Sequence, residues 1–426
     1  MTTDLTSGLD TAAFSSVIKP SDDLFRFVNG PWIDTYRLPD DKARYGSFDK
    51  LAEDAESQIR DILEDEDCPA AKSQALYRSF MDTDAIEAAG ATPIRPALDA
   101  IDHAADKAAL TRTIGALKPI DMGPDVFDIA VFGDPKNPDT NVVHLEQSGI
   151  GLPDEAYYRE DHYAPIREAY VKMVAKQLTN AKLVEADDEA ESQARRLLEV
   201  ETTIASYHWD NVATRDSQKT YNPTGHAELS TMLADYGLDA WIESWQEAYN
   251  TTTAAATQPI DFAGCFSRTI VHEPSFVKGL NAFWAAADLD DLKLWARVHV
   301  IIGSTLELPH EFDDTNFDFY GKVLSGQKQQ RDRWKRGVSL VNSVCGEDIG
   351  REYVKRHFPE SSKRRMEQLV ANLIDAYRVS ISNSAWLGEQ TKAKALEKLS
   401  KFVPKIGYTN HWRDYTALDV REEAGF

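Results

Sequence analysis

The chain has 426 residues, of which 42% are hydrophobic and 10% aromatic, and its 70 acidic and 47 basic residues give a formal net charge of -23. A single core rarely grows beyond roughly 250–300 residues, so the length predicts two lobes, or one lobe and part of another. A surface of this sign repels phosphate backbones and anionic lipids, which argues against nucleic acid or a membrane as a partner.

The cysteines and the N-terminus indicate the compartment. Cys68, Cys265 and Cys345 lie far apart and form neither a disulfide framework nor a C-x-x-C motif, so we expect buried small residues in a reducing compartment. The start lacks a basic region followed by an apolar stretch, and no apolar run reaches the roughly 18 residues of a membrane span. The sequence therefore predicts a soluble, cytoplasmic protein.

Helical periodicity dominates the chain. From Ser47, the expected N-cap, a helix with Asp49 in its first turn carries one apolar stripe, formed by Phe48, Leu51, Ala55, Ile59, Ile62 and Leu63. Further amphipathic helices are predicted at 71–89, 164–184, 186–209, 291–308, 331–358 and 361–387. Helices of this kind bury their stripes against each other, which predicts a mainly α fold.

One segment breaks the helical pattern. Residues 126–147 contain two runs of β-branched and aromatic residues around the turn-rich "GDPKNPDT", which predicts a β-hairpin. The stretches near 207–224 and 250–258 are expected to be irregular connections within one helical body. The chain has no internal repeat and no low-complexity tract.

Motif chemistry alone identifies neither a catalytic nor a metal-binding residue. A helical zinc site needs two histidines four residues apart, but "HEPSF" at 272–276 and "HEFDD" at 310–314 both lack the second histidine. The histidines are therefore expected at the surface or at helix caps. "GIGLPD" at 149–154 lacks the third glycine of a dinucleotide fingerprint, and neither a phosphate loop nor a nucleophile elbow is present.

Residues 22–65, "DDLFRFVNGPWIDTYRLPDDKARYGSFDKLAEDAESQIRDILED", point to a family. This stretch resembles the opening of the neprilysin/endothelin-converting-enzyme (M13-type, oligopeptidase O-like) zinc metallopeptidases, with their N-G-x-W and R-Y-G-x-F-D elements. "GIGLPDEAYYRED", "RDSQKTYNPTGHAEL", "AWLGEQTKAKALEKLSKFVPKIGY" and "WRDYTAL" are similar to later elements of the family, in the same order. The resemblance covers roughly residues 20 to 426.

The resemblance implies a two-lobed peptidase that encloses a central cavity. This chain would supply a large multi-helical lobe with a small β-hairpin or sheet, which closes over the zinc lobe and admits oligopeptides but not folded proteins. The implied divisions are an N-terminal extension at 1–20, a segment contacting the catalytic lobe at 21–60, the helical lobe at 61–385, and the start of the connection into the zinc lobe at 386–426.

The same resemblance implies part of a substrate site. Arg44 stands where the family's arginine binds the C-terminal side of the peptide, Phe48 where a phenylalanine lines the primed-side pocket, and Asp49 where an aspartate orients the arginine. Ala52 stands where neprilysin-like members carry a second arginine. The alternatives are an exposed Arg44 in a local ion pair with Asp49, and Phe48 as a core residue.

The zinc ligands of the family are missing from this sequence. In the family, "KIGY" and "WRDY" are followed by an N-A-x-x strand, the H-E-x-x-H helix and the segment that supplies the third ligand. "NAFW" at 281–284 lies far upstream and is expected to pack in the core. The resemblance therefore implies an N-terminal portion whose partners are an oligopeptide substrate and its own C-terminal catalytic segment, where one zinc ion is bound. We expect this portion alone to be inactive and prone to aggregate.

Two other functions remain open from the sequence. One is a non-catalytic helical protein that binds peptides or acts as a scaffold. The other is a hydrolase of another class that uses a pair of carboxyl groups, which would have to converge in a cleft.

Overall fold

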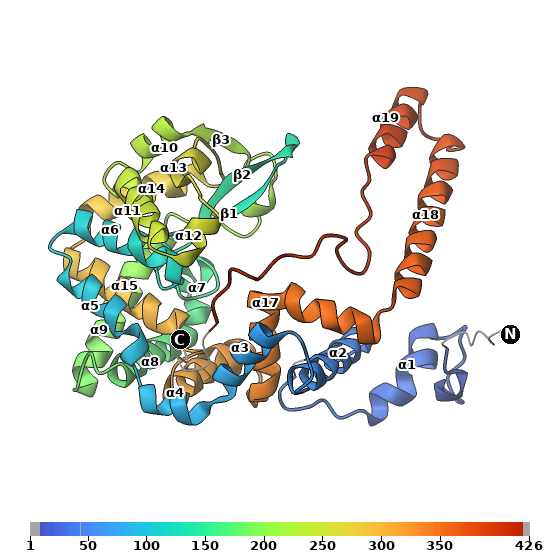
Figure 1. The fold of residues 1–426 in the computed structure, drawn as a ribbon, viewed down its shortest axis with the longest axis horizontal. Helices are drawn as coiled ribbons and strands as arrows, with labels where there is room; N and C mark the ends of the chain where they lie inside the picture. The colour runs from blue at the N-terminus through green and yellow to red at the C-terminus, as the bar shows by residue number, and fades with distance from the viewer. Residues whose placement is uncertain (1–8, 43, 421–426) are drawn as a thin grey trace.

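The computed structural model describes residues 9–42 and 44–420. They form a large helical body, a second and smaller helical core, and an arm of two helices that projects from the rest (Figure 1). The mainly α fold with one small sheet, expected from the sequence, is confirmed. Within the described ranges, no helix has the length and apolar character needed to cross a membrane.

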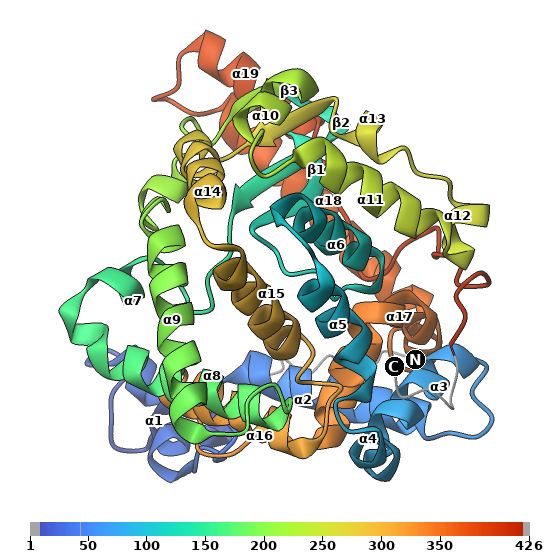
Figure 2. The same cartoon turned by 90° about the vertical axis from the view of Figure 1, so that its left-hand side faces the viewer.

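The large body is arranged around one buried helix, α15 (Leu289–Gly303), which Figure 2 shows in the middle of its neighbours. Trp295 and Val298 on α15 are almost completely buried. The other α-helices of the body are α5 (Arg95–His103), α6 (Lys107–Leu117), α7 (Ala156–Arg159), α8 (Ala164–Asn180), α9 (Asp187–Ala205), α10 (His226–Met232), α11 (Leu238–Asn250), α12 (Thr253–Thr257), α13 (Phe262–Cys265), α14 (Pro274–Ala286) and α16 (His310–Asn316). A π-helix (Phe317–Leu324) follows α16, and 3-10 turns lie at Thr92–Ile94, Lys118–Ile120, Asp161–Tyr163 and Ala213–Arg215.

The small sheet has four strands in the order β1-β2-β4-β3. β1 (Phe127–Asp134) and β2 (Asn137–Gln147) form the predicted antiparallel hairpin. β4 (Arg268–Val271) pairs parallel to β2 and antiparallel to β3 (Asn222–Gly225). These two short strands were not predicted, and they join segments far apart in the sequence.

A second hydrophobic core lies between α2 (Ser47–Leu63), α3 (Ala71–Met81) and α17 (Arg333–His357). Its buried side chains include Ile62, Tyr77 and Val341. The chain passes from this core into the large body at Asp82, where α4 (Thr83–Ala89) begins, and returns over residues 325–332. Two polar contacts fasten the returning helix: the Arg333 guanidinium donates to the Phe80 carbonyl at 2.8 and 2.6 Å, and Arg336 pairs with Asp313 of the body.

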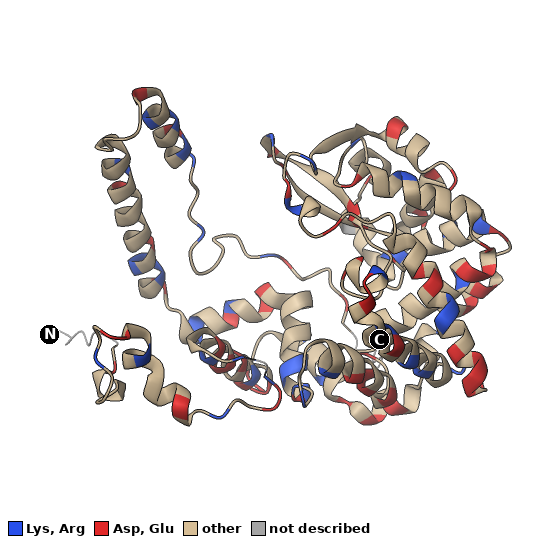
Figure 3. Ribbon diagram, turned by 180° about the vertical axis from the view of Figure 1, so that it is seen from behind, with Lys and Arg blue, Asp and Glu red and all other residues tan. Residues whose placement is uncertain are grey.

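The projecting arm consists of α18 (Glu360–Ser382) and α19 (Glu389–Ser400). The helix α1 (Leu24–Thr35), preceded by a 3-10 turn (Thr11–Ala13), lies on the same side of Figure 1, below the arm. One face of α18 exposes an apolar stripe at helical spacing, formed by Met366, Leu369, Leu373 and Tyr377. Trp386, between the two helices, is 85% exposed. Acidic residues are distributed over many helices of the large body (Figure 3).

The segment after the arm returns to the second core and is held there by Lys72. The Lys72 ammonium donates to the carbonyl oxygens of Tyr415 at 2.6 Å and Thr416 at 2.8 Å, and also to that of Leu418. The Tyr415 and Leu418 side chains pack against the second core. Tyr415 and Leu418 therefore have packing partners within the described chain.

We expect Lys72→Met to release this segment, because it removes the one ammonium that holds three carbonyl groups. Loss of about 1.4 kcal/mol of local stability would raise the rate of chymotryptic cleavage after Trp412 or Tyr415 about tenfold. Mass spectrometry of timed digests measures this rate. Lys172→Met, at an exposed lysine of α8, is the control, and equal rates in the two variants would contradict the role of Lys72.

Several predicted helix boundaries are wrong. Ser47 is the first residue of α2 rather than its N-cap, because Gly46 occupies that position and the helix start has no side-chain cap. The single helix predicted at 71–89 is two helices, since Asp82 leaves helical geometry and its carboxylate caps α4 by accepting from the Ala85 N–H at 3.0 Å. Residues 250–258, predicted irregular, contain α12.

The predicted environments of the cysteines and histidines are only partly correct. Cys68 and Cys345 are buried as expected, but Cys265 is exposed at the end of α13. His144 is buried, so a surface or cap position is wrong for this residue. Phe283 and Trp284 of "NAFW" are buried on α14, which confirms their packing role.

Candidate functional site

The three residues of the predicted substrate site lie together at the start of α2. Arg44 is exposed in the loop before the helix, and Phe48 and Asp49 are in its first turn. Phe48 is 86% exposed, so the alternative of a core residue is wrong within the described chain. The described residues also contain no ion pair between Arg44 and Asp49. The roles of Arg44, Phe48 and Asp49 toward a peptide stay predictions.

A stack of three aromatic rings fixes the chain that leads to Arg44. Trp32 and Tyr36 of the α1 end stack at 4.6 Å between ring centroids, and Tyr36 stacks on Tyr45 at 4.7 Å. The Tyr45 hydroxyl donates to Glu53 of α2 at 2.7 Å, and this hydrogen bond is the main cause of a raised Tyr45 pKa. Sequence reasoning missed this support, although the four-residue spacing of Trp32 and Tyr36 on a helix was a signal for it.

The helix that carries this site is only partly covered. Ile62 and Leu63 at its C-terminal end are buried in the second core, but Leu51 is exposed on the same stripe as Phe48. Leu24 and Phe25 of α1 are also exposed. Soluble monomers rarely leave apolar faces of this kind open, so the site borders a surface suited to a polypeptide partner.

The two histidine–glutamate pairs that match the first half of a zinc motif form hydrogen bonds with other parts of the chain. His272 and Glu273 lie between β4 and α14, and not within a helix. Glu273 is buried and accepts from the Gln147 N–H at 3.0 Å; burial raises the pKa of its carboxyl to about 7. His310, the first residue of α16, is exposed and bonds to Glu87 at 2.8 Å.

His272 forms a close pair with His144 across the parallel strands. His144 Nδ1 and His272 Nε2 are 2.9 Å apart, so one of them must carry the shared proton. The other nitrogen of His144 is buried and has no hydrogen-bond partner among the described residues. Burial lowers the pKa of His272 and the neighbouring His144 lowers it further, against the opposing effect of Glu146.

The His144–His272 pair predicts that the sheet becomes less stable at acidic pH. A histidine whose folded-state pKa is depressed contributes stability above its unfolded pKa of about 6.5, and this contribution is lost as the pH falls through the folded value. We therefore expect urea midpoints to fall between about pH 7 and pH 5, and to fall less in His272→Gln than in the wild type. His162→Gln, at an exposed histidine, is the control and should keep the wild-type slope.

Zinc does not fit the residues that the structure describes. Residues 9–42 and 44–420 contain no group of three or more histidine, cysteine, aspartate or glutamate side chains that could hold a metal ion. A zinc site takes three or four such ligands in tetrahedral geometry.

The chain is similar to a family of peptidases and to several of its members. The model of peptidase family M13 matches residues 20–409. Endothelin-converting enzyme 1 of Bos taurus is 24% identical over 421 residues, which are 96% of this chain and 54% of that protein. The chain thus spans about half the length of this curated relative.

Two solved structures of zinc metalloprotease Zmp1 from Mycobacterium tuberculosis match the fold. The inhibitor complex is 35% identical with a TM-score of 0.85 over 98% of this chain and 62% of that one. The open state is 36% identical with a TM-score of 0.78 over 96% of this chain and 62% of that one. Fold and matches together define a chain of the metallopeptidase class. It belongs to peptidase family M13.

Proposed function

We propose that this chain forms the lid lobe and part of the primed-side substrate site of a zinc-dependent metalloendopeptidase that hydrolyses oligopeptides. The match of the M13 family model to residues 20–409 is the observation that carries the proposal. The zinc ion would be held by polypeptide outside the 426 residues, in a catalytic segment that packs against this lobe.

The exposed apolar faces support a large partner surface. Leu24 on α1, Phe48 on α2 and Leu373 on α18 are more than half exposed, and they lie on three elements around one side of the fold. Covering such faces with a catalytic lobe would remove apolar area from water and stabilise the pair. Without it, the isolated chain is expected to aggregate.

The position of Arg44 supports its role toward a peptide carboxylate. Arg44 is exposed and directly precedes Tyr45, whose ring belongs to the Trp32–Tyr36–Tyr45 stack. Among the described residues, it forms no ion pair with Asp49. A guanidinium in this state can offer a planar pair of donors to a carboxylate. Phe48, at the same edge, would contribute an apolar wall for the side chain next to it.

The test compares the 426-residue chain alone with the chain co-expressed with the polypeptide encoded downstream of it. We expect bound zinc by elemental analysis, and cleavage of a quenched fluorescent peptide, only in the second sample. A chelator should abolish cleavage and added zinc should restore it. Zinc-dependent cleavage by the 426 residues alone, or peptide binding with no cleavage in either sample, would contradict the proposal, and the second result would favour a scaffold.

A further inference from the structure

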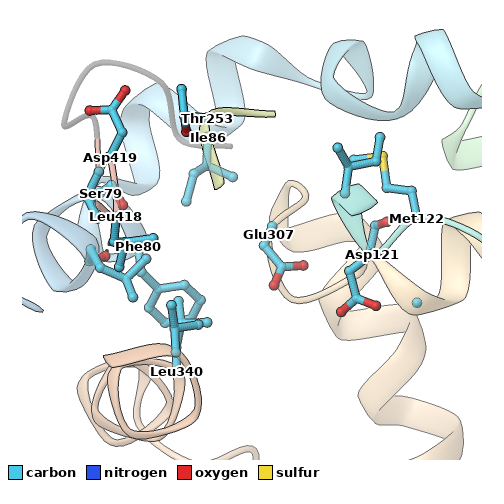
Figure 4. Close-up of a pocket in the computed structure, with 16 residues that line it drawn as sticks. Ser79, Phe80, Ile86, Asp121, Met122, Thr253, Glu307, Leu340, Leu418 and Asp419 are labelled. Carbon is cyan, nitrogen blue, oxygen red and sulfur yellow. Dashed lines mark hydrogen bonds between the residues drawn. The ribbon is translucent and has the colours of Figure 1, made fainter. Parts of the chain in front are cut away.

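A cleft of about 630 Å³ lies where the large body meets the second core. Phe80 and Leu340, from α3 and α17, line it on one side, and Asp121 and Glu307 of the body line it on the other (Figure 4). The volume is in the range of sites for small ligands or single peptide residues. The Arg44 segment does not contribute to this cleft, so it is separate from the proposed carboxylate site.

Two carboxylates, those of Asp121 and Glu307, line the body side of the cleft. Among the described residues, neither Glu307 nor Asp121 takes part in an ion pair, whereas the nearby Lys118 is paired with Asp125 at 2.6 Å. Asp313, whose charge also raises the pKa of Glu307, forms an ion pair with Arg336 of α17. Asp419, which has an interaction of its own, also lines the cleft, from the returning segment.

The backbone holds Asp121 in a special conformation. Its φ of 55° is in the left-handed region, at the end of the 3-10 turn Lys118–Ile120, and its N–H donates to the Lys118 carbonyl at 3.1 Å. Aspartate and asparagine tolerate this region better than other residues with a side chain. The turn therefore directs a carboxylate toward the cleft at a fixed place (Figure 4).

The opposite wall offers apolar contact. Phe80 is almost completely buried, and the Arg333 guanidinium lies 4.2 Å from the centroid of its ring. Leu340 is half-buried on the next helix. A ligand that lies across the cleft would meet carboxylates at one end and apolar carbon at the other.

We propose that this cleft binds a primary ammonium group carried on an apolar chain, with Glu307 and Asp121 facing the ammonium and Phe80 and Leu340 facing the carbon chain. A lysine side chain and the free N-terminus of a peptide share this chemistry. That the natural ligand is a peptide rests on the proposed peptidase function; the preference for an ammonium does not. Charge-assisted hydrogen bonds to the carboxylates supply the selectivity.

The first test uses three small probes of equal length: hexylamine, hexanol and hexanoate. Ligand-observed NMR on the full chain, without zinc, should give the order amine, alcohol, carboxylate. Glu307→Gln should weaken binding of the amine about tenfold, because it removes one charge-assisted hydrogen bond, and should leave binding of hexanol unchanged. Asp121→Asn, which keeps the turn, should also weaken the amine, and Glu199→Gln, at an exposed position of α9, is the matched control.

The pH dependence adds an independent readout. Burial, with smaller contributions from the charges of Asp121 and Asp313, raises the pKa of Glu307 to about 7. The amine should therefore bind more tightly at pH 8 than at pH 6 in the wild type, and this difference should shrink in Glu307→Gln. Leu340→Trp, which fills the cleft, should weaken amine and alcohol together. Circular dichroism spectra of each variant verify that it is folded.

Two peptide pairs then distinguish the sources of the ammonium. One pair differs by lysine against norleucine, and the other by a free against an acetylated N-terminus. Equal binding of amine and alcohol, or an amine affinity insensitive to Glu307→Gln in a folded variant, would overturn the cleft proposal. These assays measure binding without catalysis. The cleft proposal can therefore be supported when the peptidase proposal is overturned, and it can be overturned when the peptidase proposal is supported.

Discussion

Replacing Glu201 by alanine is expected to lower the free energy of unfolding of the large body by about 3–5 kcal/mol. Glu201 is completely buried on α9, and three hydrogen-bond donors satisfy its carboxylate. The hydroxyl groups of Tyr158 and Tyr170 donate to it at 2.7 and 3.0 Å, and His299 Nε2 lies 2.8 Å from it. Alanine would leave all three donors buried without an acceptor.

The same network explains the "GIGLPD" stretch, which resembles half of a nucleotide fingerprint. The Tyr158 hydroxyl accepts from the N–H groups of Gly151 and Leu152 at 3.1 and 2.9 Å while it donates to Glu201. A Cβ at Gly151 would collide with the Tyr170 hydroxyl. The glycine is therefore needed for close packing around a buried carboxylate, and the network ties α7, α8, α9 and α15 to one loop.

Urea denaturation followed by far-ultraviolet circular dichroism measures the effect of Glu201→Ala. Glu201→Gln keeps the volume and one acceptor, and should cost less, about 1–3 kcal/mol. Glu199→Ala, exposed two residues earlier on the same helix, should change stability by no more than about 0.5 kcal/mol. A midpoint of Glu201→Ala equal to that of Glu199→Ala would show that the network does not stabilise the body.

Long apolar stripes made the helices predictable from the sequence. The predicted stretches at 164–184, 186–209, 291–308 and 361–387 correspond to α8, α9, α15 and α18. Their periodicity is local, so it can be read without knowledge of the fold. The break at Asp82 could not be read in this way, because an aspartate in the middle of a helical pattern becomes a cap only when the chain turns toward another core.

The sheet and the buried charges depend on contacts between distant segments. β4 has only four residues, and its parallel pairing with β2 joins Val143 to Thr269. The sequence of residues 268–271 alone does not indicate that β2 is their partner strand. Glu201 had a local signal, since it interrupts the apolar stripe of Leu197, Val200 and Ile204, and an acid on a buried stripe indicates a network. The donors from three other elements could not be identified in advance.

The candidate site was located by family resemblance and not by physical pattern. Nothing in the composition around Arg44 distinguishes it from an ordinary surface arginine. The structure adds what the sequence lacked: the aromatic stack that orients the loop and the exposure of Phe48. Both agree with a site completed by another polypeptide, whose residues no local pattern in these positions can supply.

In the complete peptidase, Arg44→Met should lower kcat/KM for peptides by about tenfold to a hundredfold. The estimate follows from the roughly 1.5–3 kcal/mol that a hydrogen bond to a charged group contributes, since each 1.4 kcal/mol is a factor of ten. Steady-state kinetics with a peptide that has a free C-terminus, and with its amide, measures the effect. The loss should be larger for the free acid, because the guanidinium pairs with the carboxylate.

Arg37→Met, at an exposed arginine of the same loop, is the matched control and should keep wild-type kinetics. The converse change is Ala52→Arg, one helical turn after Asp49 on the exposed face of α2. A second guanidinium at that position should lower KM for the free acid and leave the amide unchanged. If Arg44→Met lowers kcat/KM equally for the free acid and the amide, Arg44 does not bind the C-terminal carboxylate. In that case Ala52→Arg should not create a preference for the free acid either.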